Sequence, residues 1–210
     1  MPGCQIEAAL LDFGGVIAEE GFAGGVKALA ARHGHEPHAL WQAGLKAVWD
    51  SGYVFGRADE AAFWALFKER TGIEGDSGIW REEILSRFVL RPWMLELADR
   101  LHGLGVRTAI LSDQTDWLSL MDERHGFFKH FDKVYNSYNY AMSKLEPRFF
   151  LMALEDLGVR PERALFVDDN AGNVARAREL GLTAILYEDR AGFEREFRAV
   201  CPEALGDSPA

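Results

Sequence analysis

The chain has 210 residues, of which 48% are hydrophobic and 27% charged, and its formal net charge at pH 7 is −10. This length and composition fit one folded domain, or one domain with an insertion, and exclude collagenous, low-complexity and disordered proteins. The acidic balance argues against nucleic acid as a partner, because a phosphate backbone is bound by a basic surface. It leaves room for a small anionic substrate held by a metal ion.

The two cysteines, Cys4 and Cys201, lie near opposite ends of the chain. Their number and separation predict neither a disulfide framework nor a zinc site, so we expect a protein of the reducing cytoplasm. The first residues lack the basic flank of a signal peptide, and no apolar run reaches membrane-spanning length. We expect no membrane partner, and either a monomer or a homodimer.

Short apolar runs that end abruptly in polar residues predict the strands of a buried parallel sheet. These runs are residues 8–11, 108–111, 133–137, 164–167 and 183–187. Between them lie helical patterns that each stop at a glycine, at residues 94–102, 148–157 and 171–180. This alternation predicts an α/β fold with a doubly wound, Rossmann-like parallel sheet.

The stretch between the first two strands has a different character. It contains no convincing strand and carries four amphipathic helical segments, at residues 26–33, 38–49, 58–70 and 79–88. We interpret it as a helical cap inserted after the first strand. The expected division is an α/β core of residues 1–17 and 93–210 and a cap of residues 18–92.

Polar residues that directly follow the predicted strands should meet at one edge of the sheet, where ligands bind in open α/β folds. In chain order these residues are Asp12, Gly14, Ser112, Asp113, Lys144, Asp168, Asp169 and Asn173. Carboxylates that converge need a counter-charge, and Mg²⁺ suits such hard oxygen ligands. With a metal neutralising phosphate oxygens, an ionised aspartate can attack phosphorus.

Four segments, LLDFGGVI, LSDQT, SKLEP and VDDNAGNV, occur in the order and spacing of the motifs of the haloacid dehalogenase-like (HAD) hydrolase superfamily. The chain resembles its phosphatase-like branch with an α-helical cap, in the form whose first motif reads DxG. The resemblance implies that Asp12 is the nucleophile and a magnesium ligand. It also implies that Asp169 is the second side-chain ligand and that Gly14 offers its backbone carbonyl.

The same resemblance assigns the phosphoryl group to Ser112 and Lys144, with Lys144 also screening the charge of the nucleophile. Asp113 lies beside Ser112 and is expected to border the bound phosphate. Asp168 and Asn173 are expected to support the site from its outer part.

Gly14 departs from the family pattern, because family phosphatases usually carry an aspartate there as general acid/base. Such a proton donor contributes roughly 10²–10⁴-fold in rate. Asp113, which replaces a common asparagine, is a candidate substitute acid. Dehalogenases and phosphonatases of the family also lack the aspartate, and Lys27 and Lys46 are the cap lysines available for phosphonatase-type Schiff-base chemistry.

The sequence thus predicts a magnesium-dependent phosphatase of a small phosphorylated metabolite, acting through an aspartyl-phosphate on Asp12. One alternative is a dehalogenase-type hydrolase in which Asp12 displaces a leaving group from carbon. Another is a non-catalytic member that binds a ligand or partner at a degraded site. Glu19 and Glu20 are interpreted as a solvated turn.

Aromatic residues of the predicted cap fall into two groups. Helical spacing indicates a core position for three of them: Phe63, Trp64 and Phe67. Four others are expected to face the cleft in part and to shape the substrate pocket: Trp41, Trp49, Tyr53 and Phe55.

Overall fold

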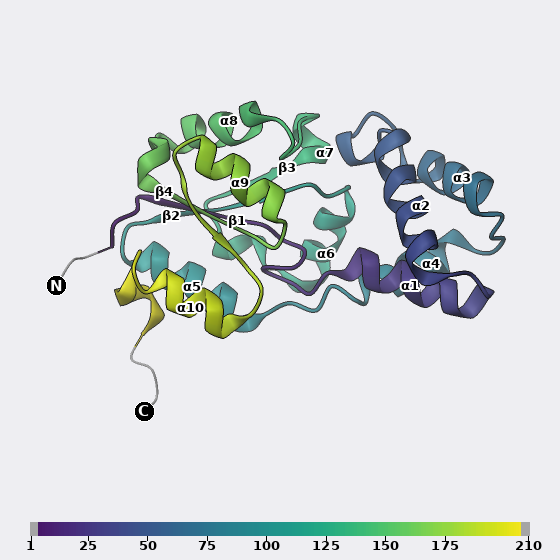
Figure 1. The fold of residues 1–210 in the computed structure, drawn as a ribbon, viewed down its shortest axis with the longest axis horizontal. Coiled ribbons are helices and arrows are strands. Elements are labelled where there is room, and N and C mark those ends of the chain that lie inside the picture. The colour runs from purple at the N-terminus through teal and green to yellow at the C-terminus, as the bar shows by residue number, and fades with distance from the viewer. Residues whose placement is uncertain (1–3, 207–210) are drawn as a thin grey trace.

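The structure is a computed structural model that describes residues 4–206. Its centre is a five-stranded sheet in which all neighbours are parallel, in the order β3-β2-β1-β4-β5 (Figure 1). The strands are β1 (Ala8–Leu11), β2 (Arg107–Ser112), β3 (Lys133–Asn136), β4 (Ala164–Asp168) and β5 (Thr183–Leu186). The predicted doubly wound α/β sheet is confirmed, and each predicted strand end lies within one residue of the observed one.

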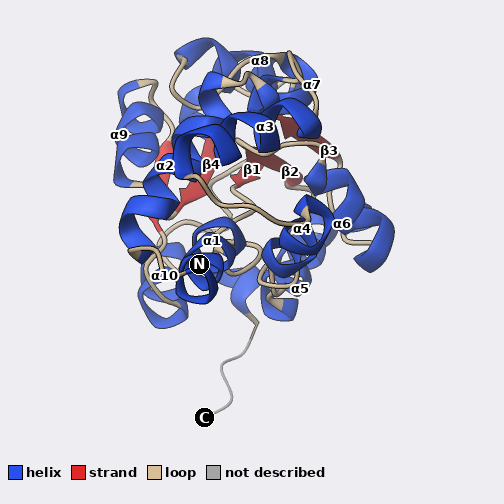
Figure 2. Ribbon diagram, turned by 90° about the vertical axis from the view of Figure 1, so that its right-hand side faces the viewer, coloured by secondary structure: helices blue, strands red, loops and turns tan. Residues whose placement is uncertain are grey.

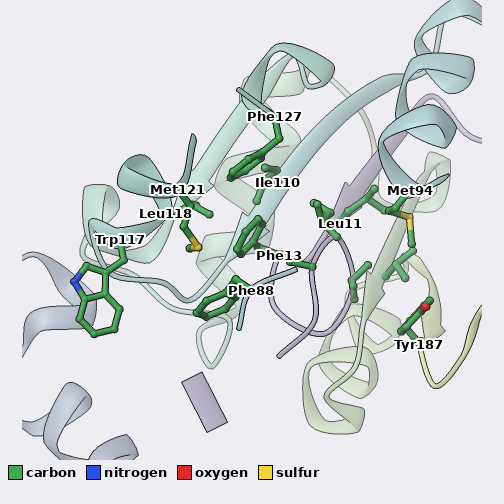
Figure 3. Packing of buried hydrophobic residues seen from close by; sticks show 14 of the residues in the cluster. Leu11, Phe13, Phe88, Met94, Ile110, Trp117, Leu118, Met121, Phe127 and Tyr187 are labelled. Carbon is green, nitrogen blue, oxygen red and sulfur yellow. The ribbon is translucent and has the colours of Figure 1, made fainter. Parts of the chain in front are cut away.

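Helices cover both faces of the sheet (Figure 2). One face packs against α8 (Pro147–Leu157) and α9 (Ala171–Glu179), and the other against α5 (Pro92–Gly103), α6 (Trp117–His125) and α10 (Arg190–Phe197). Successive residues of a strand point to opposite faces of the sheet. Leu10 therefore belongs to a first apolar cluster, on the side of α8 and α9, and Leu11 belongs to a second, on the side of α5, α6 and α10. In the second cluster, Leu11 and Ile110 lie close to the stacked rings of Phe13 and Phe127 (Figure 3).

Four helices inserted between β1 and β2 lie together beyond one end of the sheet (Figure 1). They are α1 (Gly21–His33), α2 (Pro37–Asp50), α3 (Glu60–Thr71) and α4 (Ser77–Leu85). A short helix, α7 (Ser137–Tyr140), follows β3. Phe63, Trp64 and Phe67 of α3 are buried, which confirms their predicted core positions. No helix within residues 4–206 has both the length and the apolar character needed to cross a membrane.

The chain leaves the sheet for these four helices and returns from them along two segments that are hydrogen-bonded to each other. The Glu19 backbone N–H donates to the Val89 carbonyl at 2.9 Å, and the Arg91 N–H donates to the Ile17 carbonyl at 2.8 Å. The Arg91 guanidinium adds a bond of 2.6 Å to the Ala18 carbonyl. We call this paired crossing the tie. It fixes where the inserted helices meet the sheet.

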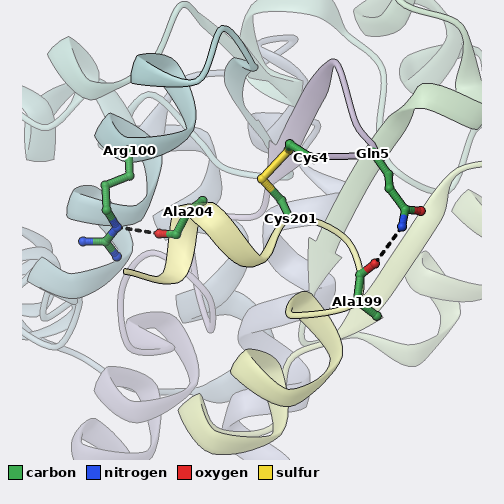
Figure 4. Close-up of a disulfide and its surroundings, with 6 residues drawn as sticks. All are labelled: Cys4, Gln5, Arg100, Ala199, Cys201 and Ala204. Carbon is green, nitrogen blue, oxygen red and sulfur yellow. Dashed lines mark hydrogen bonds between the residues drawn. A yellow bond between two sulfur atoms is a disulfide. The ribbon is translucent and has the colours of Figure 1, made fainter. Parts of the chain in front are cut away.

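Cys4 and Cys201 form a disulfide that joins the two ends of the described chain (Figure 4). Next to it, the Gln5 side-chain amide donates to the Ala199 carbonyl at 3.1 Å. The expectation that these cysteines stay apart is wrong. Their 197-residue separation along the chain hid a contact that exists because both ends of the chain return to the same side of the core.

Candidate active site

Asp12 lies at the carboxyl end of the central strand β1, at the edge where the strand order reverses and ligands bind in doubly wound sheets. Its side chain is buried at the floor of a pocket. One carboxylate oxygen, Oδ1, accepts hydrogen bonds from the Phe13 N–H at 2.7 Å and from the Ser112 hydroxyl at 2.6 Å. The other, Oδ2, lies 2.8 Å from Nζ of Lys144.

Lys144 is the buried cation of the site. Its ammonium contacts carboxylate oxygens of Asp12 at 2.8 Å and of Asp168 at 2.7 Å. Burial alone would lower the pKa of Lys144, but the carboxylates of Asp12, Asp168 and Asp113 raise it above its ordinary value. Lys144 therefore carries a positive charge at neutral pH and is available to bind an anionic group.

Asp168, at the end of β4, is fully buried and uses its carboxylate within the protein. It accepts from Lys144 Nζ, from the Asn173 side-chain amide at 3.1 Å and from the Asn170 backbone N–H at 2.7 Å. These contacts make Asp168 an anchor for Lys144, and Asn173 in turn orients Asp168.

Three carboxylates gather at this edge of the sheet. Asp12, Asp168 and Asp169 each place an oxygen so that the three lie within 4.8 Å of one another. They outnumber the one ammonium among them, and burial raises the pKa of Asp12 despite the opposing effect of Lys144. A divalent cation with hard oxygen ligands fits this set by charge and by ligand chemistry.

The backbone beside this cluster is shaped by glycine. Gly15 has φ +84°, and a Cβ built there would lie 2.2 Å from an oxygen of Asp169. Only glycine lets the loop after β1 pass this close to the carboxylate. Gly14, the residue expected to offer its carbonyl to a metal, lines the same pocket.

Asp113 and Glu20 are the two remaining carboxylates of the pocket. Asp113 accepts from the Lys144 backbone N–H at 3.0 Å and so holds the loop that carries the lysine; burial raises its pKa. Glu19 and Glu20 are both exposed, as expected for a solvated turn, but Glu20 also lines the pocket, whereas Glu19 pairs with Arg91 at 3.0 Å. Its place at the pocket could not be read from the sequence, because Glu20 does not directly follow the end of a strand.

The pocket encloses about 250 Å³, close to the lower end of the range for small-molecule sites, roughly 300–1,000 Å³. Its floor is polar and comes from the strand ends. The opposite wall is apolar and comes from α1, α2 and the turn after α2, with the side chains of Phe22, Ala23, Trp41, Leu45, Val48, Trp49 and Val54.

The structure separates the four aromatic residues expected at the cleft. Trp41 and Trp49 line the pocket, whereas Tyr53 is fully buried and neither it nor Phe55 lines the pocket. Tyr53 instead belongs to the short turn of residues 53–55 after α2, and its ring stacks on the ring of Phe63 in α3. Lys27 does not line the pocket either, and its ammonium lies 5.1 Å from the centre of the Trp41 ring.

The fold and this site define an α/β protein with a polar pocket floor at the carboxyl edge of a doubly wound sheet. A family model for haloacid dehalogenase-like hydrolases matches residues 6–181, and the chain belongs to this family of hydrolases.

Relatives with known functions cover several activities. The chain is 30% identical over 140 residues to bifunctional epoxide hydrolase 2 of Rattus norvegicus, an alignment of 63% of this chain but only 25% of that protein. It is 28% identical to phosphoserine phosphatase of Thermus thermophilus, over 95% of this chain and 86% of that enzyme. This chain therefore spans about a quarter of the epoxide hydrolase and most of the phosphatase.

Solved structures share the fold. A HAD family enzyme from Bacteroides thetaiotaomicron superposes with a TM-score of 0.73 at 24% identity, covering 94% of this chain and all of that one. The wild-type form of that enzyme in complex with magnesium and inorganic phosphate superposes with a TM-score of 0.66 at 22% identity, over 90% of this chain and 98% of that one.

Proposed function

We propose that this protein is a magnesium-dependent phosphatase of a small phosphorylated metabolite. The observation that carries the proposal is the buried Asp12 carboxylate, held between the Ser112 hydroxyl and the Lys144 ammonium beside Asp169. A nucleophile, an anion-binding pair and further carboxylate oxygens for a cation thus share one pocket floor. The magnesium-and-phosphate complex of the Bacteroides enzyme, which has the same fold, supports the assignment.

In the proposed reaction, Asp12 attacks phosphorus and its new O–P bond replaces the bond to the departing alcohol. Lys144 and Ser112 hold the phosphoryl oxygens and keep phosphorus facing Asp12. Magnesium, when bound, would be held by Asp12, Asp169 and the Gly14 carbonyl, and would neutralise phosphate oxygens. Water then cleaves the Asp12-phosphate and releases inorganic phosphate.

The apolar wall indicates the kind of alcohol that is released. No charged side chain of α2 lines the pocket, so a carboxylate or ammonium group lying against α2 would lose hydration without gaining a partner from that helix. The substrate that fits best is the monoester of a small uncharged alcohol with an apolar surface.

Asp12→Asn tests the mechanism. The variant keeps the size of the side chain and removes the nucleophile, so hydrolysis of a panel of phosphate monoesters should fall by at least about 10³-fold at saturating magnesium. Assays with and without magnesium, and thermal unfolding to verify the fold, complete the experiment. Undiminished hydrolysis by folded Asp12→Asn would refute the aspartyl-phosphate.

The same panel distinguishes the two alternatives. A dehalogenase-type hydrolase would release halide from a haloacid without any metal and would leave phosphate esters intact. A non-catalytic binding protein would bind phosphate in a magnesium-dependent manner without turnover.

A further inference from the structure

The proposed reaction releases an alcohol, and an alkoxide leaves slowly unless a proton reaches its oxygen as the bond to phosphorus breaks. The donor must stand beside the leaving oxygen, between the phosphate floor and the wall that holds the alcohol. Five pocket carboxylates could act as this donor: Asp12, Glu20, Asp113, Asp168 and Asp169.

Contacts within the site assign other work to four of these five groups. Asp12 attacks phosphorus, and Asp169 belongs to the proposed cation site. Asp168 is fully buried beneath Lys144 and bonded through both of its oxygens. Both oxygens of Asp113 lie within 3.3 Å of the Lys144 backbone nitrogen, which holds its carboxylate against the loop.

Glu20 is the carboxylate that remains, and its position is set by Gly14. A Cβ built on Gly14 would lie 2.8 Å from Oε2 of Glu20. Gly14 does not have a positive φ, so its backbone would accept a side chain. The carboxylate of Glu20 thus occupies the space above the floor that a side chain at position 14 would fill, two residues after the nucleophile.

The two oxygens of Glu20 have different surroundings. Oε1 accepts from the Ala23 backbone N–H at 3.0 Å and caps the first turn of α1. Oε2 faces Gly14, at the border between the polar floor and the apolar wall that begins with Phe22. The cap holds the side chain in place, while Oε2 lies at the pocket, 2.8 Å from the position of a Cβ built on Gly14.

We propose that Glu20 is the general acid and base of this site, which rests on the proposed phosphatase function. As the Asp12–phosphorus bond forms and the bond from phosphorus to the alcohol oxygen breaks, the Glu20 carboxyl gives its proton to that oxygen. Its carboxylate then takes a proton from the water whose oxygen attacks phosphorus and displaces Asp12. Phosphate is released, and Glu20 is again protonated.

Glu20→Gln is the matching variant, because the amide keeps the shape and the oxygen that caps α1 but transfers no proton. With an alkyl phosphate, we expect kcat/KM to fall by about 10²–10⁴-fold. With p-nitrophenyl phosphate, whose leaving group departs without a proton, kcat/KM should change less than about threefold. The first turnover should then appear as a burst of nitrophenol, because the water step still lacks its base.

Glu19→Gln is the control, since Glu19 is the adjacent glutamate and pairs with Arg91 outside the pocket; both esters should react as with wild type. Asp12→Asn should lose both esters, so failure of the phosphatase function is visible separately. Equal kcat/KM losses for the two esters in folded Glu20→Gln would overturn the proposal. So would an ester-selective loss in Asp113→Asn with no such loss in Glu20→Gln.

Discussion

Gly15 is the residue at which a single methyl group would reach the acidic cluster. A Cβ there would overlap an oxygen of Asp169 at 2.2 Å, in addition to the strain of a side chain at φ +84°. Gly34 also has a positive φ, at +71°, but nothing lies within 4 Å of its Cβ position. Alanine substitutions at both positions would strain the backbone, but only the one at Gly15 would also displace the Asp169 carboxylate.

We expect Gly34→Ala to lower the free energy of unfolding by about 1–2 kcal/mol, the cost of a left-handed conformation with a side chain, and to leave hydrolysis unchanged. Gly15→Ala should cost more, and it should also raise the magnesium concentration needed for half-maximal activity by tenfold or more. Urea unfolding and magnesium titrations of activity measure the two effects. Similar stability losses with unchanged magnesium dependence would show that Asp169 is not displaced.

The environment of Lys144 shows why the sequence could indicate which residues lie at the candidate site but not most of their contacts. Asp12 directly follows β1, and Ser112 and Asp168 end β2 and β4, so the parallel topology alone brings them together at one edge. Lys144 joins them because the loop that carries it is bonded to Asp113. Apart from the contact of Lys144 with Asp12, which the family resemblance implied, the hydrogen-bond partners of these side chains depend on packing and had no signal in the sequence.

At the scale of elements, α2 supplies most of the apolar wall of the pocket. Leu45 on this helix lines the pocket and is 39% exposed. Leu151 on α8 is 45% exposed and does not line it. Two partly exposed helical leucines thus differ mainly in their relation to the pocket.

We expect Leu45→Ala to raise KM about fivefold for the phosphate ester of an apolar alcohol, because about 1 kcal/mol of apolar contact is lost. Inhibition by inorganic phosphate, which has no alcohol part, should be unaffected. Leu151→Ala should change neither constant. Steady-state kinetics with the ester give KM, and competition with phosphate gives its inhibition constant. An equal rise in the inhibition constant of phosphate would place Leu45 at the phosphate subsite instead.

Elements with a clear apolar period were predictable, and those with a weak one were not. Both α6 and α10 were missed; α10 buries only Phe193 and Phe197 among its polar residues. The start of α1 was placed five residues too late, because its glycine-rich first turn resembles a loop. What stabilises that turn is the capping side chain of Glu20, whose position at the pocket the sequence did not indicate.

At the scale of the whole molecule, the Cys4–Cys201 disulfide closes nearly the entire chain into a covalent loop. Such a cross-link restricts the unfolded chain most when the loop is long. We expect reduction to lower the free energy of unfolding by about 4 kcal/mol. Urea unfolding with and without a thiol reductant measures this difference.

The double variant Cys4→Ser/Cys201→Ser is the control for the disulfide. It should match the reduced wild-type protein and should not respond to reductant. Hydrolysis by the folded variant should be unchanged, because neither cysteine lines the pocket. Wild-type stability that is insensitive to reductant would contradict the covalent closure.

The tie between the inserted helices and the sheet has a mechanical consequence. Its outgoing segment ends at Glu19, and Glu20 is the next residue, so the side chain proposed as proton donor is the first one beyond the tie. The apolar wall follows directly on α1 and α2. Because Glu20 caps α1 and most of the wall lies on α1 and α2, a change at the tie would displace the wall and the Glu20 carboxylate together. The tie therefore couples the place of the alcohol to the place of the proposed proton donor.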